Sequence, residues 1–294
     1  MKEIEAEWED GQATLQIYPE RGIPPSLSVC GASAVGNREY QQDAMWYMGR
    51  KQDFLAAVCD GMGGMEGGEI ASARAIEEME RCFVREPVPV REVPAFLCRT
   101  AQKMNQAVCS LTDSDGRALE CGTTIASVYI CGNRAYWLSL GDSKLYLIKK
   151  DHMICPFKPH NYQTVLDGYL EKGSISMEEY EREAERGEAL TGFLGMGRIQ
   201  SCEIAEQPEL LEPGDQILIC SDGLYKALTE DQIRNIVEIC RDDFDQTAQV
   251  LIQAAQQYGA APLDNITVVC IRLKDDTEIL KKNEEEEDEF STVP

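Results

Sequence analysis

The sequence has very few histidines and no closely spaced cysteine pair. It holds two His and twelve Cys in 294 residues, and no two cysteines form a C-x-x-C pair. Structural zinc is held by Cys and His, commonly at that spacing, so a zinc site is not expected. Most of the cysteines lie singly in apolar runs, as at Cys59, Cys131, Cys220 and Cys270. We expect them to be reduced and packed in a core.

Long hydrophobic runs are also missing. No stretch approaches the ~20 consecutive apolar residues of a membrane helix. The first five residues, MKEIE, have no basic region that leads into an apolar signal segment. The sequence therefore predicts a cytoplasmic protein without a membrane partner.

Positive charge is scarce. There are 28 Lys and Arg against 52 Asp and Glu, a net charge of −24, and no basic cluster that would bind a phosphate backbone. A nucleic-acid partner is therefore not expected. Residues 274–294 hold nine acidic side chains, six of them consecutive from Glu284 to Glu289, and are expected to form a disordered tail. The rest has the length and apolar content of one large domain, which we expect to be a monomer.

The first half of the chain shows a strand, a glycine-rich segment and helices. Residues 54–60 form an apolar run, residues 61–68 are rich in glycine, and apolar residues at helical spacing follow over 70–83. A second helix is predicted from Pro94 to Leu111. Strands are predicted at 123–131, 134–140 and 145–150, joined by turns.

The second half begins with an inserted segment. Residues 160–195 show two short helical patches and a capping box at Ser176 and Glu179, which predicts a helical flap. A strand at 216–221, a capping box at Thr229 and Gln232, a helix over 248–258 and a strand at 266–273 follow. Because strands and helices come in blocks, we expect an α+β fold of antiparallel sheets covered by helices.

Three aspartates occupy similar places. Asp60 ends one predicted strand, Asp222 ends another, and Asp264 comes just before a third. Two carboxylates about 4 Å apart repel by about 4 kcal/mol at an effective dielectric of 20, and a divalent cation removes that cost. Oxygen ligands without histidine favour Mg²⁺ or Mn²⁺ over zinc. Each aspartate alone is equally typical of a turn or a helix cap.

Six motifs, taken in order, resemble a known family. They are GNREYQQDAM (36–45), DGMGGMEGGEIAS (60–72), CGTTIAS (121–127), LGDSKLYLI (140–148), CSDGLYKAL (220–228) and DNITVVCI (264–271). Together they resemble the type 2C metal-dependent Ser/Thr protein phosphatases, in their bacterial style. The resemblance spans about residues 28–273, the catalytic domain, and leaves an N-terminal extension at 1–27 and the tail at 274–294. It implies a four-layer α/β/β/α sandwich with the flap at about 160–195.

The resemblance also implies a metal site. Asp60 would bridge two Mn²⁺ or Mg²⁺ ions, the Gly61 carbonyl would bind one of them, and Asp222 and Asp264 would hold the other. A hydroxide between the ions would attack the phosphorus of phosphoserine or phosphothreonine in proteins.

Two further residues receive roles in the same way. Arg38 would clamp the phosphate oxygens with its planar fork of donors, and Asp43 would orient water on the metal. The Arg38 side chain could instead form an ordinary surface ion pair. The implied partners are phosphoprotein substrates, including a Ser/Thr kinase that the enzyme would oppose.

The sequence departs from the family at several places. Gln42 replaces an Asn or Glu, and Met62 stands where many eukaryotic members carry a His, so a histidine general acid is absent there. Asp142 matches an acid that helps to bind a third metal in the family. Lys226, however, stands where another acid often contributes, and its charge is expected to weaken or displace that ion. Neither His152 nor His160 is expected to be catalytic.

Two other functions remain open at this stage. A phosphatase-like domain could bind a phosphoprotein or signal through the flap without turnover, and a metal-dependent hydrolase could act on small phosphate esters. A nucleotide-binding loop is not indicated, because Glu66 stands where the last glycine of G-x-G-x-x-G belongs.

Overall fold

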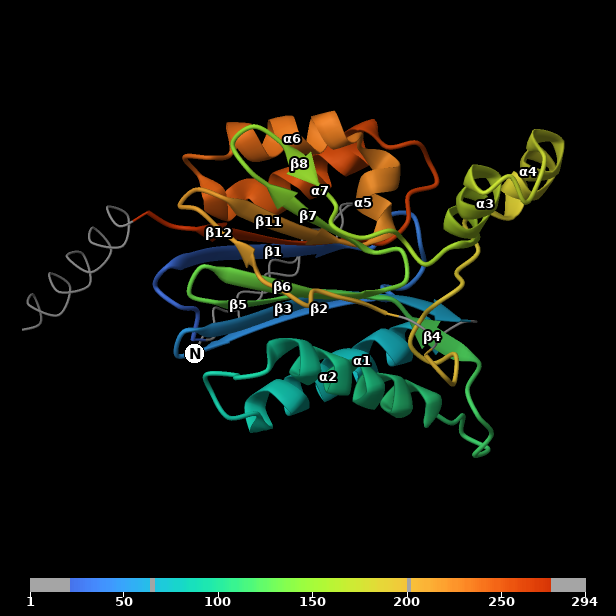
Figure 1. The fold of residues 1–294 in the computed structure, drawn as a ribbon, viewed down its shortest axis with the longest axis horizontal. Helices are drawn as coiled ribbons and strands as arrows, with labels where there is room; N and C mark the ends of the chain where they lie inside the picture. Colours follow the sequence, from blue (N-terminus) through green and yellow to red (C-terminus); the bar gives the residue numbers. More distant parts are fainter. Residues whose placement is uncertain (1–21, 64–66, 200–201, 276–294) are drawn as a thin grey trace, which may run out of the picture.

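Two antiparallel sheets pack face to face, and helices cover both outer faces (Figure 1). The computed structural model describes residues 22–63, 67–199 and 202–275. The expected four-layer α+β sandwich is confirmed. Most of the predicted N-terminal extension and nearly all of the predicted acidic tail lie outside the described residues.

The first sheet has five strands and contains the last strand of the domain. Every neighbouring pair in it is antiparallel. Its order is β1 (Leu27–Ala34), β12 (Ile266–Leu273), β11 (Gln216–Cys220), β7 (Lys144–Ile148) and β8 (Met153–Ile154).

The second sheet has seven strands and is built around β3. Its main path is β10 (Glu209–Leu210), β6 (Arg134–Leu140), β5 (Ile125–Cys131), β3 (Asp53–Gly63) and β2 (Asp43–Arg50). Off this path, β4 (Cys121–Thr123) pairs with β3, and β9 (Glu203–Ile204) pairs with β6.

The helices fall into two groups, one on each sheet. In Figure 1, α1 (Gly67–Arg85) and α2 (Val93–Cys109) lie against the seven-stranded sheet. The other sheet is covered by α5 (Asp222–Ala227), α6 (Glu230–Ile239) and α7 (Thr247–Tyr258). The predicted capping box at Thr229 and Gln232 is present and begins α6. No helix in the described ranges combines the length and hydrophobicity that crossing a membrane requires.

The core forms three clusters, one between the sheets and one under each helical layer. The central strands are buried on both faces, which explains why their sequences are continuous apolar runs. Phe54 and Val58 of β3 and Ile219 of β11, all fully buried, belong to the cluster between the sheets. All twelve cysteines are free, as expected, but only five are buried, and Cys131 is partly exposed.

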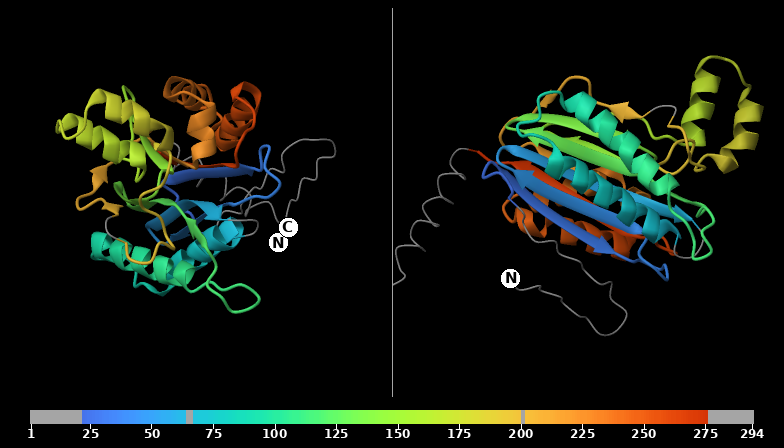
Figure 2. Two further views of the ribbon diagram at one scale, coloured as in Figure 1. Left: turned by 90° about the vertical axis from the view of Figure 1, so that its right-hand side faces the viewer. Right: turned by 90° about the horizontal axis from the view of Figure 1, so that it is seen from below.

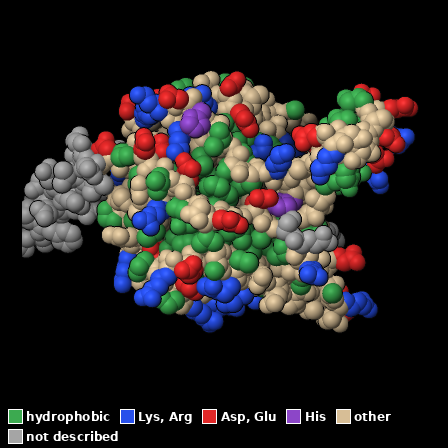
Figure 3. All heavy atoms as spheres, in the orientation of Figure 1, with side chains coloured by type: hydrophobic (Ala, Val, Ile, Leu, Met, Phe, Trp, Pro, Cys, Tyr) green, Lys and Arg blue, Asp and Glu red, His purple; other side chains and the backbone are tan. Residues whose placement is uncertain are grey.

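The predicted flap is confirmed as two helices that project from the sandwich (Figures 1 and 2). They are α3 (Tyr162–Glu171) and α4 (Met177–Glu183), followed by a 3-10 turn at Ala184–Arg186. The Ser176 and Glu179 capping box begins α4 as predicted. Acidic, basic and hydrophobic side chains all reach the flap surface (Figure 3).

The structure corrects two of the predicted elements and adds two strands that were not predicted. The glycine-rich segment 61–68 is not all loop, because β3 continues through Gly63 by pairing with β4 and α1 begins at Gly67; residues 64–66 lie outside the described residues. The predicted strand 123–131 is interrupted between β4 and β5. Strands β1 and β2 were not predicted, although each has eight residues.

Candidate metal centre and active site

The three aspartates come from both sheets. Asp60 lies inside β3 of the seven-stranded sheet, so the prediction that it ends a strand is wrong. Asp222 begins α5 directly after β11, and Asp264 lies two residues before β12. Burial raises the pKa of Asp60 well above its usual value, and the charges of Asp43 and Asp222 raise it further. The acids of both sheets therefore lie near one another at one end of the sandwich.

The main chain of Asp60 is fixed by two threonines of the CGTT motif. Its N–H donates to Thr124 Oγ1 at 2.9 Å. Its carbonyl accepts from the Thr124 N–H and from Thr123 Oγ1, both at 2.9 Å. Thr124 Oγ1 also lies 2.7 Å from Ser143 Oγ, next to Asp142. The interruption between β4 and β5 thus serves to hold Asp60.

Gly61 occupies a position where no side chain fits. A Cβ there would overlap the carbonyl oxygen of Gly68 and lie 2.5 Å from that of Gln42. The Gly61 N–H donates to the same Gln42 oxygen at 3.1 Å. Main chains from three segments therefore meet at this point. The role of the Gly61 carbonyl as a metal ligand stays a prediction.

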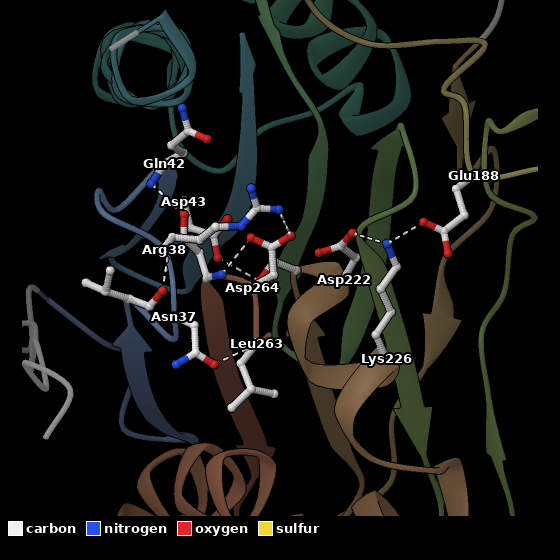
Figure 4. Close-up of polar contacts among 12 residues, drawn as sticks. Asn37, Arg38, Gln42, Asp43, Glu188, Asp222, Lys226, Leu263 and Asp264 are labelled. Carbon is white, nitrogen blue, oxygen red and sulfur yellow. Dashed lines mark hydrogen bonds and ion pairs between the residues drawn. The ribbon is translucent and has the colours of Figure 1, made fainter. Parts of the chain in front are cut away.

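Asp222 has one paired and one unpaired oxygen. Its Oδ2 forms an ion pair with Lys226 Nζ at 2.8 Å, and Lys226 also contacts Glu188 of the flap at 3.1 Å (Figure 4). Its Oδ1 is buried and has no hydrogen-bond partner. Burial lowers the pKa of Lys226, but the hydrogen bond and charge of Asp222 outweigh it, so that pKa is raised overall.

Asp264 is paired with Arg38. Arg38 Nη2 donates to Asp264 Oδ2 at 2.6 Å, and the Arg38 side chain is 58% exposed (Figure 4). The hydrogen bond and the charge of Asp264 raise the pKa of Arg38. Arg38 thus lies at the site and binds one of the predicted metal ligands, while its role as a phosphate clamp stays a prediction.

Asn265 holds the loop that carries Arg38, and the sequence analysis missed it. Its Nδ2 donates to the carbonyls of Val35 at 2.8 Å and Tyr40 at 3.0 Å. Its Oδ1 accepts from the Gln42 N–H at 2.8 Å. The side chain therefore fixes both ends of the segment 35–42. Its position beside Asp264 in the DNITVV motif was the only sequence feature that pointed to it.

Asp43 links the two sheets beneath the site. It begins β2, pairs with Asp60 in β3, and is almost fully buried. Its Oδ2 accepts from Ser221 Oγ at 2.7 Å, and Ser221 belongs to the other sheet's β11–α5 junction. Burial raises the pKa of Asp43 to about 7 despite hydrogen bonds from Ser221 and Thr267. No sequence pattern pointed to Ser221 as a partner of Asp43. The role of Asp43 in orienting water stays a prediction.

The raised pKa of Asp43 predicts a pH dependence of stability in chelated protein. The folded state binds this proton more tightly than the unfolded state, whose Asp pKa is about 3.9. The stabilisation is therefore complete below about pH 4 and is lost as the pH rises to about 7. Asp43→Asn keeps an oxygen acceptor for Ser221 and does not titrate.

The measurement is urea unfolding of both proteins in chelator between pH 4 and 8. Relative to Asp43→Asn, the unmodified chain is expected to lose free energy of unfolding as the pH rises through this window. A difference between the two proteins that does not change with pH would contradict the assignment.

Asp142 lies at the far side of the same cluster. It is 8% exposed, and burial followed by the charge of Asp222 raises its pKa to about 6, against an opposing effect of Lys226. Its carbonyl accepts from Tyr225 Oη at 3.1 Å. Asp142 thus neighbours Asp222 and Lys226, although its predicted part in a third metal site is untested.

The donor set fits a hard divalent cation. Carboxylate oxygens dominate it, and the buried Oδ1 of Asp222 lacks the partner that a buried carboxylate normally requires. Within residues 22–63, 67–199 and 202–275, no three His, Cys, Asp or Glu side chains converge in metal-binding geometry. Instead Arg38 and Lys226 bind Asp264 and Asp222. The assignment of Asp60, Asp222 and Asp264 as ligands therefore remains a prediction.

Both ends of the flap are attached next to the site. The His160 N–H donates to the Gly141 carbonyl at 2.7 Å, beside Asp142. At the other end, Leu194 and Thr123 exchange two main-chain hydrogen bonds of 2.8 and 3.0 Å. Thr123 is one of the residues that hold Asp60. His160 lies at the flap base, in keeping with its expected place outside the chemistry.

Comparison with known proteins shows the family. The family model described as "Protein phosphatase 2C" matches residues 30–265, most of the chain. The chain therefore belongs to the protein phosphatase 2C family, and the resemblance drawn from the six motifs is confirmed. The expected enzyme class, a protein phosphatase, is the class of this family.

The chain is similar to bacterial members of the family. The protein phosphatase PhpP of Streptococcus pneumoniae is 29% identical over 256 residues, which cover 85% of this chain and 97% of PhpP. The Ser-Thr phosphatase MsPP of Mycobacterium smegmatis, solved in complex with cacodylate, is 29% identical with a TM-score of 0.64 and covers 84% of this chain and 98% of its own.

A third solved structure bears on the metal. The catalytic domain of the serine/threonine protein phosphatase PstP, solved in complex with two manganese ions, has a TM-score of 0.68 and 24% identity. The alignment covers 85% of this chain and 99% of the PstP chain. At this identity the likeness shows a shared fold.

Proposed function

We propose that this chain is a metal-dependent phosphatase that hydrolyses phosphoserine and phosphothreonine in proteins. Two Mn²⁺ or Mg²⁺ ions would be held by Asp60, the Gly61 carbonyl, Asp222 and Asp264. Family membership supports this function. The observation that carries the site is the buried, unpaired Oδ1 of Asp222, near Asp60, whose pKa is raised by burial and by the charges of Asp43 and Asp222.

The chemistry follows from the two ions and the residues around them. A pair of divalent ions, when bound, would supply a hydroxide from bound water and offset charge on the phosphate. Asp60 would hold them from one sheet, and Asp222 and Asp264 from the other. No side chain needs to form a covalent intermediate with the phosphate.

Arg38 and Asp43 have separate tasks in this proposal. The Arg38 guanidinium would exchange its bond to Asp264 for bidentate hydrogen bonds to phosphate oxygens, and its exposed position leaves it free to do so. Asp43 would fix the sheet junction through Ser221 and, when ionised, accept a hydrogen bond from water at the centre and so orient it.

The proposal extends to the substrates and the boundaries of the domain. The substrates would be phosphoproteins, among them a Ser/Thr kinase that the enzyme opposes. Residues 28–273 would form the catalytic domain, and the flap at about 160–195 would contact the protein part of the substrate. The location would be the cytoplasm.

A phosphothreonine peptide tests the function directly. Purified protein is expected to release phosphate from the peptide with Mn²⁺, to stop in excess chelator and to recover when Mn²⁺ is restored. Nucleotide and sugar phosphates serve as comparison substrates. Faster hydrolysis of these small esters than of the peptide would contradict the substrate class. Tight peptide binding without phosphate release would favour a non-catalytic phosphoprotein-binding domain.

The Arg38→Ala variant tests the phosphate clamp. It is expected to raise KM for the phosphopeptide by about tenfold or more with a smaller change in kcat, because anchoring the phosphate is largely ground-state binding. Arg38→Lys, the matched variant, keeps the positive charge but loses the planar set of guanidinium donors. Its KM is therefore expected to lie between those of the wild type and Arg38→Ala. Unchanged steady-state kinetics in Arg38→Ala would contradict the phosphate clamp and favour the alternative that Arg38 only forms a surface ion pair.

A further inference from the structure

The ammonium group of Lys226 lies among carboxylates at the edge of the candidate centre. It is 2.8 Å from Asp222 Oδ2 and 3.1 Å from Glu188 Oε2 (Figure 4). It also acts on the charge of Asp142, the buried neighbour of Asp222. A single positive charge therefore interacts with three acidic side chains and offsets part of their negative charge.

Its two ion pairs differ in burial. The Asp222 side chain is 13% exposed, whereas that of Glu188 is 83% exposed. An exposed pair is screened by water and contributes little. The pair with Asp222 is shielded, so the main effect of Lys226 is on Asp222 and the neighbouring Asp142, and the contact with the flap is secondary.

The position of the ammonium is set by α5. Asp222 lies in the first turn of this short helix and Lys226 four residues later, on the same face. The adjacent Tyr225 donates its hydroxyl to the Asp142 carbonyl at 3.1 Å, and Lys144 lies over the Tyr225 ring at 4.2 Å from its centre. These contacts fix α5 against Asp142.

We propose that the Lys226 ammonium takes the place of an additional divalent cation between Asp142 and Asp222. This inference rests on the proposed function, since it concerns which ions the same centre accepts. The chain then holds two divalent ions and no third. A divalent ion placed between Asp142 and Asp222 would repel the ammonium and lose the Asp222 oxygen that Lys226 already binds. The positive charge at this point is thereby independent of metal concentration.

The test counts Mn²⁺ ions bound per chain by titration calorimetry and native mass spectrometry. The wild-type chain is expected to bind two. Lys226→Asp supplies a carboxylate in place of the ammonium and is expected to bind a third. Lys172→Asp makes the same change at an exposed flap position and is expected to bind two, as the wild type does.

A second variant covers the case in which Lys226→Asp does not fold. Lys226→Asn offers a neutral oxygen and is expected to take up a third ion at higher Mn²⁺ concentration; thermal unfolding monitors the fold of each variant. A third ion in the wild-type chain would overturn the inference, as would the absence of any gain in both Lys226 variants.

Failure of the inference and failure of the proposed function give different results. A wild-type chain that binds two ions and does not hydrolyse the phosphopeptide refutes the function and leaves the inference. A wild-type chain that hydrolyses the peptide and binds three ions refutes the inference and leaves the function. A wild-type chain that binds no Mn²⁺ refutes both.

Discussion

Replacing Asp60 by Asn is expected to lower kcat for a phosphothreonine peptide by about two to three orders of magnitude or more. The substitution removes a charge and almost no volume from the residue that would bridge the two ions. The main-chain bonds from Asp60 to Thr123 and Thr124 do not depend on its side chain, so the fold is expected to persist.

The stability of the same variant provides a separate readout. The neighbouring carboxylates and burial raise the pKa of Asp60, which means that its charged form is destabilised in the folded chain. Asp60→Asn is therefore expected to unfold at the same or a higher temperature in chelator, and to lose the stabilisation that Mn²⁺ gives the wild type. Asp151→Asn, at an exposed turn, is the control. Wild-type turnover in Asp60→Asn would contradict the bridging role.

Gly61→Ala is expected to disrupt both the fold around the site and metal binding. The added Cβ would overlap the Gly68 carbonyl oxygen and crowd that of Gln42, and all of these atoms belong to main chain that cannot turn aside. Overpacking of this kind costs about 1–3 kcal/mol of unfolding free energy, or more. Relieving this overlap would displace β3 at Gly61, directly beside Asp60. The affinity for Mn²⁺ is therefore expected to fall as well.

Gly168→Ala gives the matched comparison. Gly168 lies in α3 of the flap, and a Cβ there meets nothing within 4 Å. The same change is expected to stabilise this variant by about 0.5–1 kcal/mol, since Ala favours a helix over Gly. Urea unfolding and Mn²⁺ titration of both variants check the pair. If Gly61→Ala had the stability and Mn²⁺ affinity of the wild type, the close packing of the Gly61, Gly68 and Gln42 main chains would not be needed for the site.

Strong local patterns explain which elements could be predicted. The two capping boxes and the buried runs of β3, β11 and β12 carry their own sequence evidence, and each was found, although β3 extends to Gly63 beyond its predicted end. Strand β1, with the sequence LSVCGASA, is made largely of small and polar residues, and its stability comes from pairing with β12 more than 230 residues away. Local patterns do not reveal such pairing.

In the site, too, features with local sequence patterns could be predicted and long-range contacts could not. The aspartates could be found because they lie at the ends of apolar runs and within recognisable motifs. Asn265 and Ser221 act through hydrogen bonds to segments about 180 to 230 residues away, so their partners depend on the tertiary fold. Lys226 was noticed as a departure, but its pairing with Asp222 as well as with the flap became visible only in the folded chain.

The division of the aspartates between two sheets has a consequence for how the protein matures. Neither sheet alone carries all of the proposed ligands, so a folding intermediate whose layers have not yet docked would lack a complete metal site. Ion uptake would then come late in folding, after the layers join. Mn²⁺ is expected to slow amide hydrogen exchange in β3, β11 and β12 together, including amides far from the ions along each strand.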